Sequence, residues 1–195
     1  MTIAFALGNG VSRKDIDLNV LAQVGRVYGC NRLYQDFTPT ALVATDRLIS
    51  TEIQESGWSG KHRFHTRRPI PGLGAQPVPK QYYGSSSGPI CVALSCLDGN
   101  QKVFLLGFDL GPTEAGKFNN VYADTLYYKK STDSPTFTGN WIKQIVQVTT
   151  DFKVVEFIRV CGPTTARIPE FEMLPNLKNM QMPQFLEWLN NEKDF

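Results

Sequence analysis

Three short polar clusters border apolar runs, and their residue types suit hydrogen bonding to a small anionic ligand. Residues 8–12 (GNGVS) end the first apolar run, and two glycines there let the backbone approach a ligand closely. Residues 29–31 end a second apolar run with an amide side chain. Residues 85–88 place three hydroxyl groups before a nearly all-apolar segment that predicts a buried helix. Backbone N–H groups and hydroxyls at such helix starts bind phosphates and carboxylates.

Each cluster also has a structural interpretation that the sequence leaves open. The two glycines can form a tight turn, Asn31 can cap the turn after its strand, and one of the three serines can be the helix N-cap. The first cluster matches neither GxGxxG nor a Walker loop, because no GK[ST] follows it. The order of the clusters therefore carries more information than any one of them.

The clusters lie between segments that alternate between strand and helix. The sequence predicts strands over residues 2–7, 26–30, 41–44, 102–109 and 154–160. It predicts helices that open near Arg13, run over 47–56, run from Pro89 to an exit at Gly99, and cover 141–148 and 183–189. This alternation indicates one α/β, Rossmann-like three-layer domain over residues 1–195 with a mainly parallel sheet. Ligands bind beyond the carboxyl ends of such strands, so we expect Asn9, Asn31 and Ser87 to converge on one cleft.

Two stretches interrupt the alternation. Residues 57–84 are basic and rich in Gly and Pro, which predicts a lid-like loop insertion. His62 and His65 lie there, among basic residues that either bind phosphate or face solvent. Residues 111–140 contain Gly, Asn, Ser, Thr and aromatic residues and predict a second excursion from the sheet.

Composition argues against several classes of protein. A formal net charge of +2 over 195 residues gives no electrostatic reason to expect a nucleic-acid partner. No apolar run is long enough to span a membrane and no basic leader precedes the first one, so we expect a cytoplasmic protein. The four cysteines lie far apart in apolar stretches, which predicts reduced thiols and no metal site. The sequence is compatible with a homo-oligomer.

The order of the clusters resembles a known family. Residues 8–12 (GNGVS), the Ile16-Asp17 pair, and then Cys30-Asn31 with Tyr34 are similar to the start of the Campylobacter-type lipooligosaccharide sialyltransferases. In that family the pattern is GNGPS, an ID pair, and CN with an aromatic residue three positions on. The resemblance here runs without a gap.

Two later segments extend the resemblance to about half of the chain. Ser86-Ser87-Gly88 and the strand that leads to Gly107-Phe108-Asp109 are similar to the TSG and IYLSGIDF segments of the same family. Residues 39–46 (PTALVATD) are closer to a sister group, which contains the motility-accessory flagellin glycosyltransferases and a hydroxymethylpterin diphosphokinase.

The resemblance implies a donor site for a CMP-linked sugar that works without a metal or another cofactor. The residues that it assigns to nucleotide binding are Gly8, Asn9, Gly10, Ser12, Asn31, Ser86, Ser87 and Gly88. It also implies that Tyr122 stabilises the leaving phosphate, with Tyr127 or Tyr128 as a second phenol.

The general base of the family is a histidine after these tyrosines, and this chain has no histidine beyond His65. Asp46 follows a predicted strand, so its carboxylate can act as the base or bind a metal. The alternative is that Asp46 is the N-cap of the helix that begins at Arg47.

Taken together, these observations favour a sialyltransferase-like glycosyltransferase that transfers a sugar from a CMP-linked donor to an unknown glycan acceptor. One alternative is Mg²⁺-dependent pyrophosphoryl transfer to a pterin-like alcohol, which needs carboxylates such as Asp46. The other is a non-catalytic nucleotide-binding or interaction protein, because the chain is compact and lacks the histidine. Compact chains with this arrangement resemble bacteriophage proteins, so this alternative includes a phage accessory protein in the host cytoplasm.

Overall fold

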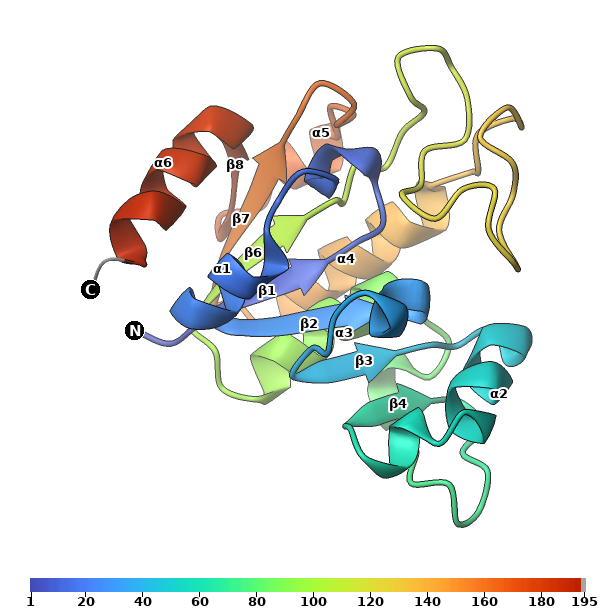
Figure 1. Cartoon of the computed structure of the whole chain (residues 1–195). Helices are drawn as coiled ribbons and strands as arrows, with labels where there is room; N and C mark the ends of the chain where they lie inside the picture. The colour runs from blue at the N-terminus through green and yellow to red at the C-terminus, as the bar shows by residue number, and fades with distance from the viewer. Residues whose placement is uncertain (194–195) are drawn as a thin grey trace.

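The structure, a computed structural model, describes residues 1–193 and contains an eight-stranded parallel sheet with helices on both faces (Figure 1). The strands are β1 (Ile3–Leu7), β2 (Arg26–Cys30), β3 (Ala41–Val43), β4 (Phe64–Thr66), β5 (Gln76–Pro77), β6 (Lys102–Leu106), β7 (Glu156–Cys161) and β8 (Leu177–Gln181). The helices are α1 (Leu18–Val24), α2 (Arg47–Glu55), α3 (Ser87–Leu97), α4 (Gly139–Asp151), α5 (Pro169–Glu172) and α6 (Met182–Glu192). The predicted α/β, Rossmann-like three-layer fold is confirmed.

The order of the strands, β5-β4-β3-β2-β1-β6-β7-β8, places the first strand in the middle of the sheet. The chain adds β2 to β5 on one side of β1, crosses back through α3, and adds β6 to β8 on the other side. The connection after β1 passes over one face of the sheet through α1, and the connection after β6 passes over the other face through α4. A crevice opens where neighbouring connections separate in this way, at the carboxyl ends of β1 and β6.

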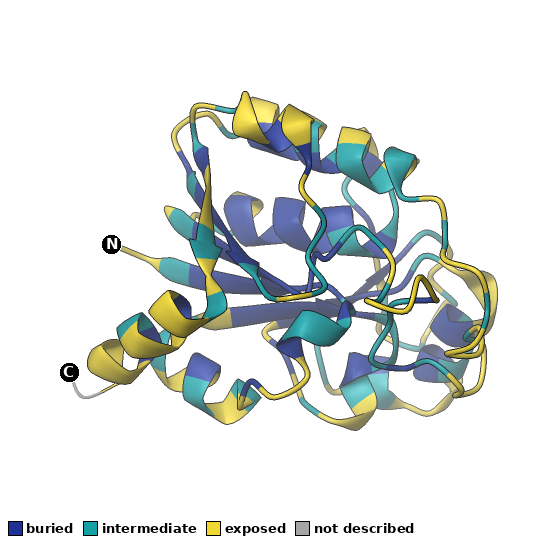
Figure 2. Cartoon of the chain, turned by 90° about the horizontal axis from the view of Figure 1, so that it is seen from above, coloured by how far each residue is buried: buried dark blue, intermediate teal, exposed yellow. Residues whose placement is uncertain are grey.

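Alternating side chains along β1 explain why its apolar run is continuous. Ala4 and Ala6 pack on the face that α3 and α4 cover, and Phe5 and Leu7 pack on the face that α1, α2 and α6 cover. A strand that is buried on both faces has no position for polar residues. Figure 2 shows the buried strands between two layers of helices, whose outer surfaces are exposed.

The segment over residues 57–84 differs from the sequence prediction. It is not a loop detached from the sheet, because it contains β4 and β5, which extend the sheet beyond β3. The three residues of β4 are too few to give a recognisable pattern among basic neighbours, and β5 contains Pro77, which sheets accept only at an edge. The edge strand β8 also escapes sequence prediction, because most of its residues are exposed or polar.

Two boundaries near the cavity described below also differ from the prediction. The segment Val11–Arg13 forms only a 3-10 turn, and α1 begins at Leu18, where the Asp17 side chain accepts a hydrogen bond from the Asn19 N–H at 2.9 Å. The predicted strand over 102–109 ends at Leu106, because Gly107 takes a positive φ of 70° and turns the chain.

No disulfide joins the four cysteines, all of which lie in the described part of the chain. Cys30, Cys91 and Cys96 are buried, and Cys161 is partly exposed. Within residues 1–193, no helix combines the length and the apolar content that crossing a membrane requires.

A polar network joins β4 to the C-terminal end of α3. Two N–H groups of the Arg63 guanidinium donate to the Asp98 carboxylate at 2.6 and 3.1 Å, and the Tyr28 hydroxyl donates to it at 2.7 Å. His65 is buried beside this pair, and its Nδ1 donates to the Pro77 carbonyl at 3.0 Å. Its Nε2 is therefore unprotonated and accepts a hydrogen bond from Arg63 Nε at 3.1 Å. Burial lowers the pKa of His65 below its ordinary value of 6.5, and the Arg63 charge acts in the same direction.

We expect the protein to lose stability as the pH falls below about 6.5. Because folding lowers the pKa of His65, the unfolded chain binds more protons in the window between that lowered pKa and the ordinary value. The contribution of His65 to the free energy of unfolding is complete above this window and is lost as the pH falls through it. Urea denaturation near neutral pH and in mild acid measures the loss.

The two histidines provide a matched comparison. The substitution His65→Gln should reduce the loss of stability in acid, whereas His62→Gln should keep it, because His62 lies outside the network with Arg63. An undiminished loss in the His65→Gln protein would show that other groups cause it.

Candidate functional site

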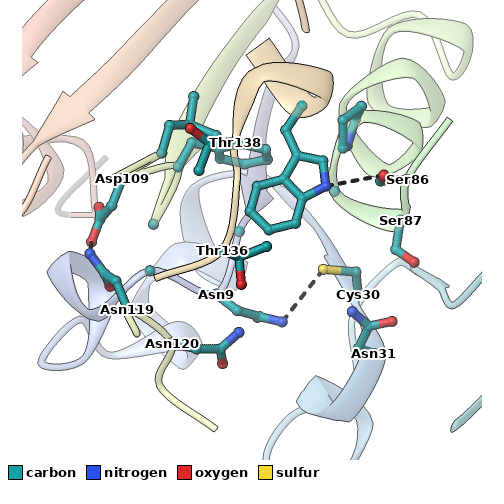
Figure 3. A pocket seen from close by; sticks show the side chains of 18 of the residues that line it. Asn9, Cys30, Asn31, Ser86, Ser87, Asp109, Asn119, Asn120, Thr136 and Thr138 are labelled. Atoms are coloured by element: carbon teal, nitrogen blue, oxygen red, sulfur yellow. Dashed lines mark hydrogen bonds between the residues drawn. The ribbon is translucent and has the colours of Figure 1, made fainter. Parts of the chain in front are cut away.

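A cavity of about 330 Å³ lies at the carboxyl ends of β1, β2, β3 and β6, where the strand order predicts a crevice. Turns after these strands, the start of α3 and part of the excursion (here residues 111–138) form its wall. The predicted nucleotide-binding residues that line it are Gly8, Asn9, Gly10, Asn31, Ser86, Ser87 and Gly88 (Figure 3). The predicted convergence of Asn9, Asn31 and Ser87 on one cleft is therefore confirmed. The volume lies at the small end of the range for ligand sites.

Two positions in the turn after β1 must be glycine, because there is no room for a Cβ atom at either of them. A Cβ atom at Gly8 would lie 2.5 Å from the carbonyl oxygen of Gly107, and one at Gly10 would lie 2.4 Å from Cγ of Asp109. Both distances are far shorter than van der Waals contact, so the turn after β1 packs directly on the turn after β6. These glycines therefore serve the packing of the two turns as well as lining the cavity.

The buried side chain of Arg13 orients the amide of Asn9. Its Nε donates to the Gly8 carbonyl at 2.6 Å, and its Nη2 donates to Asn9 Oδ1 at 3.1 Å. Because Oδ1 accepts this bond, the Nδ2 group of Asn9 is turned the other way, toward Cys30 Sγ at 3.8 Å (Figure 3). Asn9 thus presents a hydrogen-bond donor on the cavity wall.

The amide oxygen of Asn31 is an acceptor buried in the cavity wall. Asn31 has a positive φ of 55°, which asparagine tolerates better than most residues. Its Oδ1 is buried and has no hydrogen-bond partner among the described residues. The 3-10 turn that starts there has no side-chain cap, so the structure does not support the capping interpretation of Asn31. A buried acceptor without a donor costs about 1–3 kcal/mol.

The serines at the start of α3 hold the helix in place. The indole Nε1 of Trp141 donates to Ser86 Oγ at 3.1 Å (Figure 3), and the Ser87 hydroxyl lies 3.0 Å from both the N–H and the hydroxyl of Thr45. The hydroxyls predicted to bind an anion thus connect α3 to α4 and to the turn after β3. What the start of α3 offers to a ligand is the backbone N–H groups of Ser87 and Gly88, since the Ser86 N–H donates to Gln144 at 2.9 Å and Pro89 has no N–H.

Asp46 brings a carboxylate to the cavity wall. It occupies the N-cap position of α2, but its side chain makes no capping hydrogen bond. The residue is exposed, and among residues 1–193 it forms no ion pair. Its carboxylate is therefore free to accept a proton or a hydrogen bond from a ligand.

Asp109 also lines the cavity, but both of its oxygens are occupied by protein donors. The carboxylate is 2% exposed. Its Oδ2 accepts from the Ser12 N–H at 3.1 Å, Asn119 Nδ2 at 3.2 Å and the Thr164 hydroxyl at 2.8 Å. Its Oδ1 accepts from the hydroxyls of Ser12 and Thr165. Asp109 therefore joins the segments after β1, β6 and β7 and is a structural residue.

Two predicted site residues are not among those that line the cavity. Ser12 is held by Asp109, as described, and does not open a helix. Tyr122 is buried, its hydroxyl donates to Asp36 at 2.8 Å, and Arg13 lies 3.5 Å from the same oxygen. Burial raises the pKa of Tyr122 well above 10. With both contacts made inside the protein, Tyr122 supports Arg13 rather than facing a ligand in the cavity.

The sequence analysis does not predict several of the residues that line the cavity. Asn119 and Asn120 come from the excursion, which is anchored where Asn119 Oδ1 accepts from the Val11 N–H at 2.8 Å. Trp141 comes from α4, and Arg67 follows β4. The polar Asn119-Asn120 pair and the basic run around Arg67 were the available signals, but neither gives a position in space.

Comparisons with known proteins leave the site to be interpreted from its own geometry. No family model matches the chain, and neither a curated protein nor a solved structure matches it. Within the described 193 residues, no group of three or more His, Cys, Asp and Glu side chains is arranged to hold a metal ion.

We expect Asp109→Ala to lower the free energy of unfolding by about 3 kcal/mol or more, because several buried donors lose their shared acceptor. Chemical denaturation measures the effect. Glu114→Ala removes an exposed carboxylate from the excursion and should change stability by no more than about 0.5 kcal/mol. Equal stabilities of the two variants would contradict the structural role of Asp109.

Proposed function

We propose that the chain binds a nucleotide-linked sugar in this cavity, with a CMP-linked sugar as the favoured donor, and transfers the sugar without a metal ion. The observation that carries the proposal is the convergence of Asn9, Asn31 and the start of α3 on one cavity at the carboxyl ends of the strands. These are the positions to which the resemblance assigns nucleotide binding. The proposal takes its chemistry from that resemblance and its support from the geometry of the cavity.

The chemical groups on the wall suit the parts of a nucleotide. Asn9 offers a donor and Asn31 an acceptor, a combination that complements a base edge carrying both kinds of group, such as that of cytosine. Backbone N–H groups at the start of α3 suit a phosphate. Trp141 and Phe108 add aromatic surface against which a flat ring can pack.

The proposed reaction is a displacement at the anomeric carbon of the donor sugar. The bond between this carbon and the phosphate oxygen breaks, and CMP leaves with the electron pair. The acceptor hydroxyl oxygen forms the new bond to the same carbon, and its proton passes to Asp46, the free carboxylate on the wall. The α3 N–H groups stabilise the charge on the departing phosphate.

A thermal-shift measurement tests the binding step. At a CMP concentration of about 100 times Kd, binding adds about 2.7 kcal/mol, which raises the Tm by about 5–10 °C for a chain of this size. CMP should act without Mg²⁺ and more strongly than UMP, AMP or GMP. Stabilisation only by ATP with Mg²⁺ would instead favour pyrophosphoryl transfer, and no stabilisation by any nucleotide would contradict the proposal.

The substitution Asn31→Gly should weaken CMP binding by about 1–3 kcal/mol, because it removes the unpartnered acceptor. Glycine tolerates the positive φ at this position, so the backbone should remain in place. The matched control is Tyr127→Gly, which changes another residue with a positive φ that is not among the lining residues. Calorimetric titration should give an unchanged Kd for this control, and equal Kd values for both variants would exclude Asn31 from the site.

We expect Asp46→Asn to lower kcat for CMP release from CMP-sialic acid by about 10²–10⁴-fold, since the general base is lost. The Kd for CMP should change little, because Asp46 is not assigned to binding. Asp15→Asn removes an exposed carboxylate outside the cavity and should leave both quantities unchanged. If the wild-type protein binds the donor but releases no CMP, the non-catalytic alternative applies.

A further inference from the structure

Arg67 supplies a positive charge to the cavity that the proposed reaction has not used. It directly follows β4, is half-buried, and is the only Lys, Arg or His among the described residues that line the cavity. No carboxylate within residues 1–193 forms an ion pair with it. A guanidinium without a counter-ion on a cavity wall is poised to bind an anion.

Two hydrogen bonds hold the guanidinium of Arg67 in one orientation. Its Nε donates to the Tyr83 carbonyl at 2.7 Å, and its Nη2 donates to the Ser85 carbonyl at 2.6 Å. Both carbonyls belong to the segment that leads into α3, so the charge lies beside the start of this helix. A guanidinium has five N–H donors, and these two bonds leave three of them for a ligand.

The neighbouring charges do not neutralise Arg67. The carboxylate of Asp109 is occupied by five donors from other segments, and Asp46 makes no ion pair. The start of α3 adds the positive end of a helix dipole. The Oδ1 atom of Asn31, which is buried in the same wall, also has no partner among the described residues.

We propose that Arg67 binds the phosphoryl group of the ligand, so that the ligand is a phosphate ester and its phosphate lies between Arg67 and the start of α3. The nucleoside part of this ligand rests on the proposed function, but the phosphate part rests on Arg67 and its place beside the start of α3. The arginines of the basic run, residues 61–68, therefore have different roles. Arg63 pairs with Asp98, and Arg67 turns to the cavity.

Arg68 is the matched control for Arg67. It is the next residue and also an arginine, but it is exposed and does not line the cavity. Its backbone makes two hydrogen bonds: the N–H donates to Thr66 Oγ1 at 3.4 Å, and the carbonyl accepts from Gln54 Nε2 at 3.3 Å. Removing its charge changes the net charge of the protein as Arg67→Gln does, without touching the site.

Calorimetric titrations with CMP, cytidine and inorganic pyrophosphate test the proposal on the wild-type protein, Arg67→Gln, Arg67→Lys and Arg68→Gln. We expect Arg67→Gln to weaken CMP binding by about 10- to 100-fold and to leave cytidine binding unchanged. Unchanged cytidine binding also shows that the variant keeps its cavity. Arg67→Lys should recover part of the affinity, because lysine keeps the charge but not the fork of donors. Arg68→Gln should bind like the wild type.

The three probes separate failure of this inference from failure of the proposed function. In one outcome, the wild type binds pyrophosphate, binds neither cytidine nor CMP more tightly than pyrophosphate, and Arg67→Gln no longer binds pyrophosphate. The nucleotide proposal then fails, and the role of Arg67 stands. If Arg67→Gln binds CMP and pyrophosphate as the wild type does, the role of Arg67 is wrong. If the wild type binds no phosphate-containing probe, the role of Arg67 is also wrong.

Discussion

The carboxylate of Asp109 is buried, and the need to surround it with hydrogen-bond donors shapes the cavity end of the sheet. Its donors come from Ser12 after β1, Asn119 in the excursion, and Thr164 and Thr165 after β7. A buried carboxylate with fewer donors would be costly, so these distant segments are drawn to one point. The cavity is the space that remains between this point and the start of α3.

Two buried arginines complete the interior around this carboxylate. Arg159 donates to the carbonyls of Phe108, Asp109 and Ala166 at 2.8 to 3.1 Å, and its guanidinium carbon lies 5.2 Å from the centre of the Phe171 ring. Arg13 holds the Gly8 carbonyl from the other side. Burial lowers the pKa of Arg159, but an arginine remains charged in proteins. The turns after β1 and β6 are thus fixed by charged hydrogen bonds on both sides, and a rigid wall costs a ligand little ordering on binding.

The sequence is enough to predict the central strands of the sheet, but it is not enough to predict where the segments farther from the centre lie. The residues of β1 and β6 are apolar on both faces, so their place in the middle of the sheet follows from their composition. The turns after such strands must share one edge of the sheet, which explains why the grouping of Asn9 and Asn31 was predictable. Arg67 follows β4, a strand of three residues next to the edge strand β5, and Trp141 lies in a helix that follows a long excursion. Their positions depend on packing between distant segments, which no local pattern records.

The central place of β1 also affects the order in which the fold can assemble. Among the strands of the sheet, β1 comes first along the chain; β2, which pairs with one of its edges, ends at Cys30, but its other partner, β6, begins only at Lys102. A nascent chain that ends before β6 therefore presents the free edge of an apolar strand, Ile3–Leu7, which is a template for pairing with other chains. Because the cavity wall includes the turn after β6, ligands cannot shield this edge at that stage. This edge of β1 stays unpaired until the second half of the sheet is synthesised.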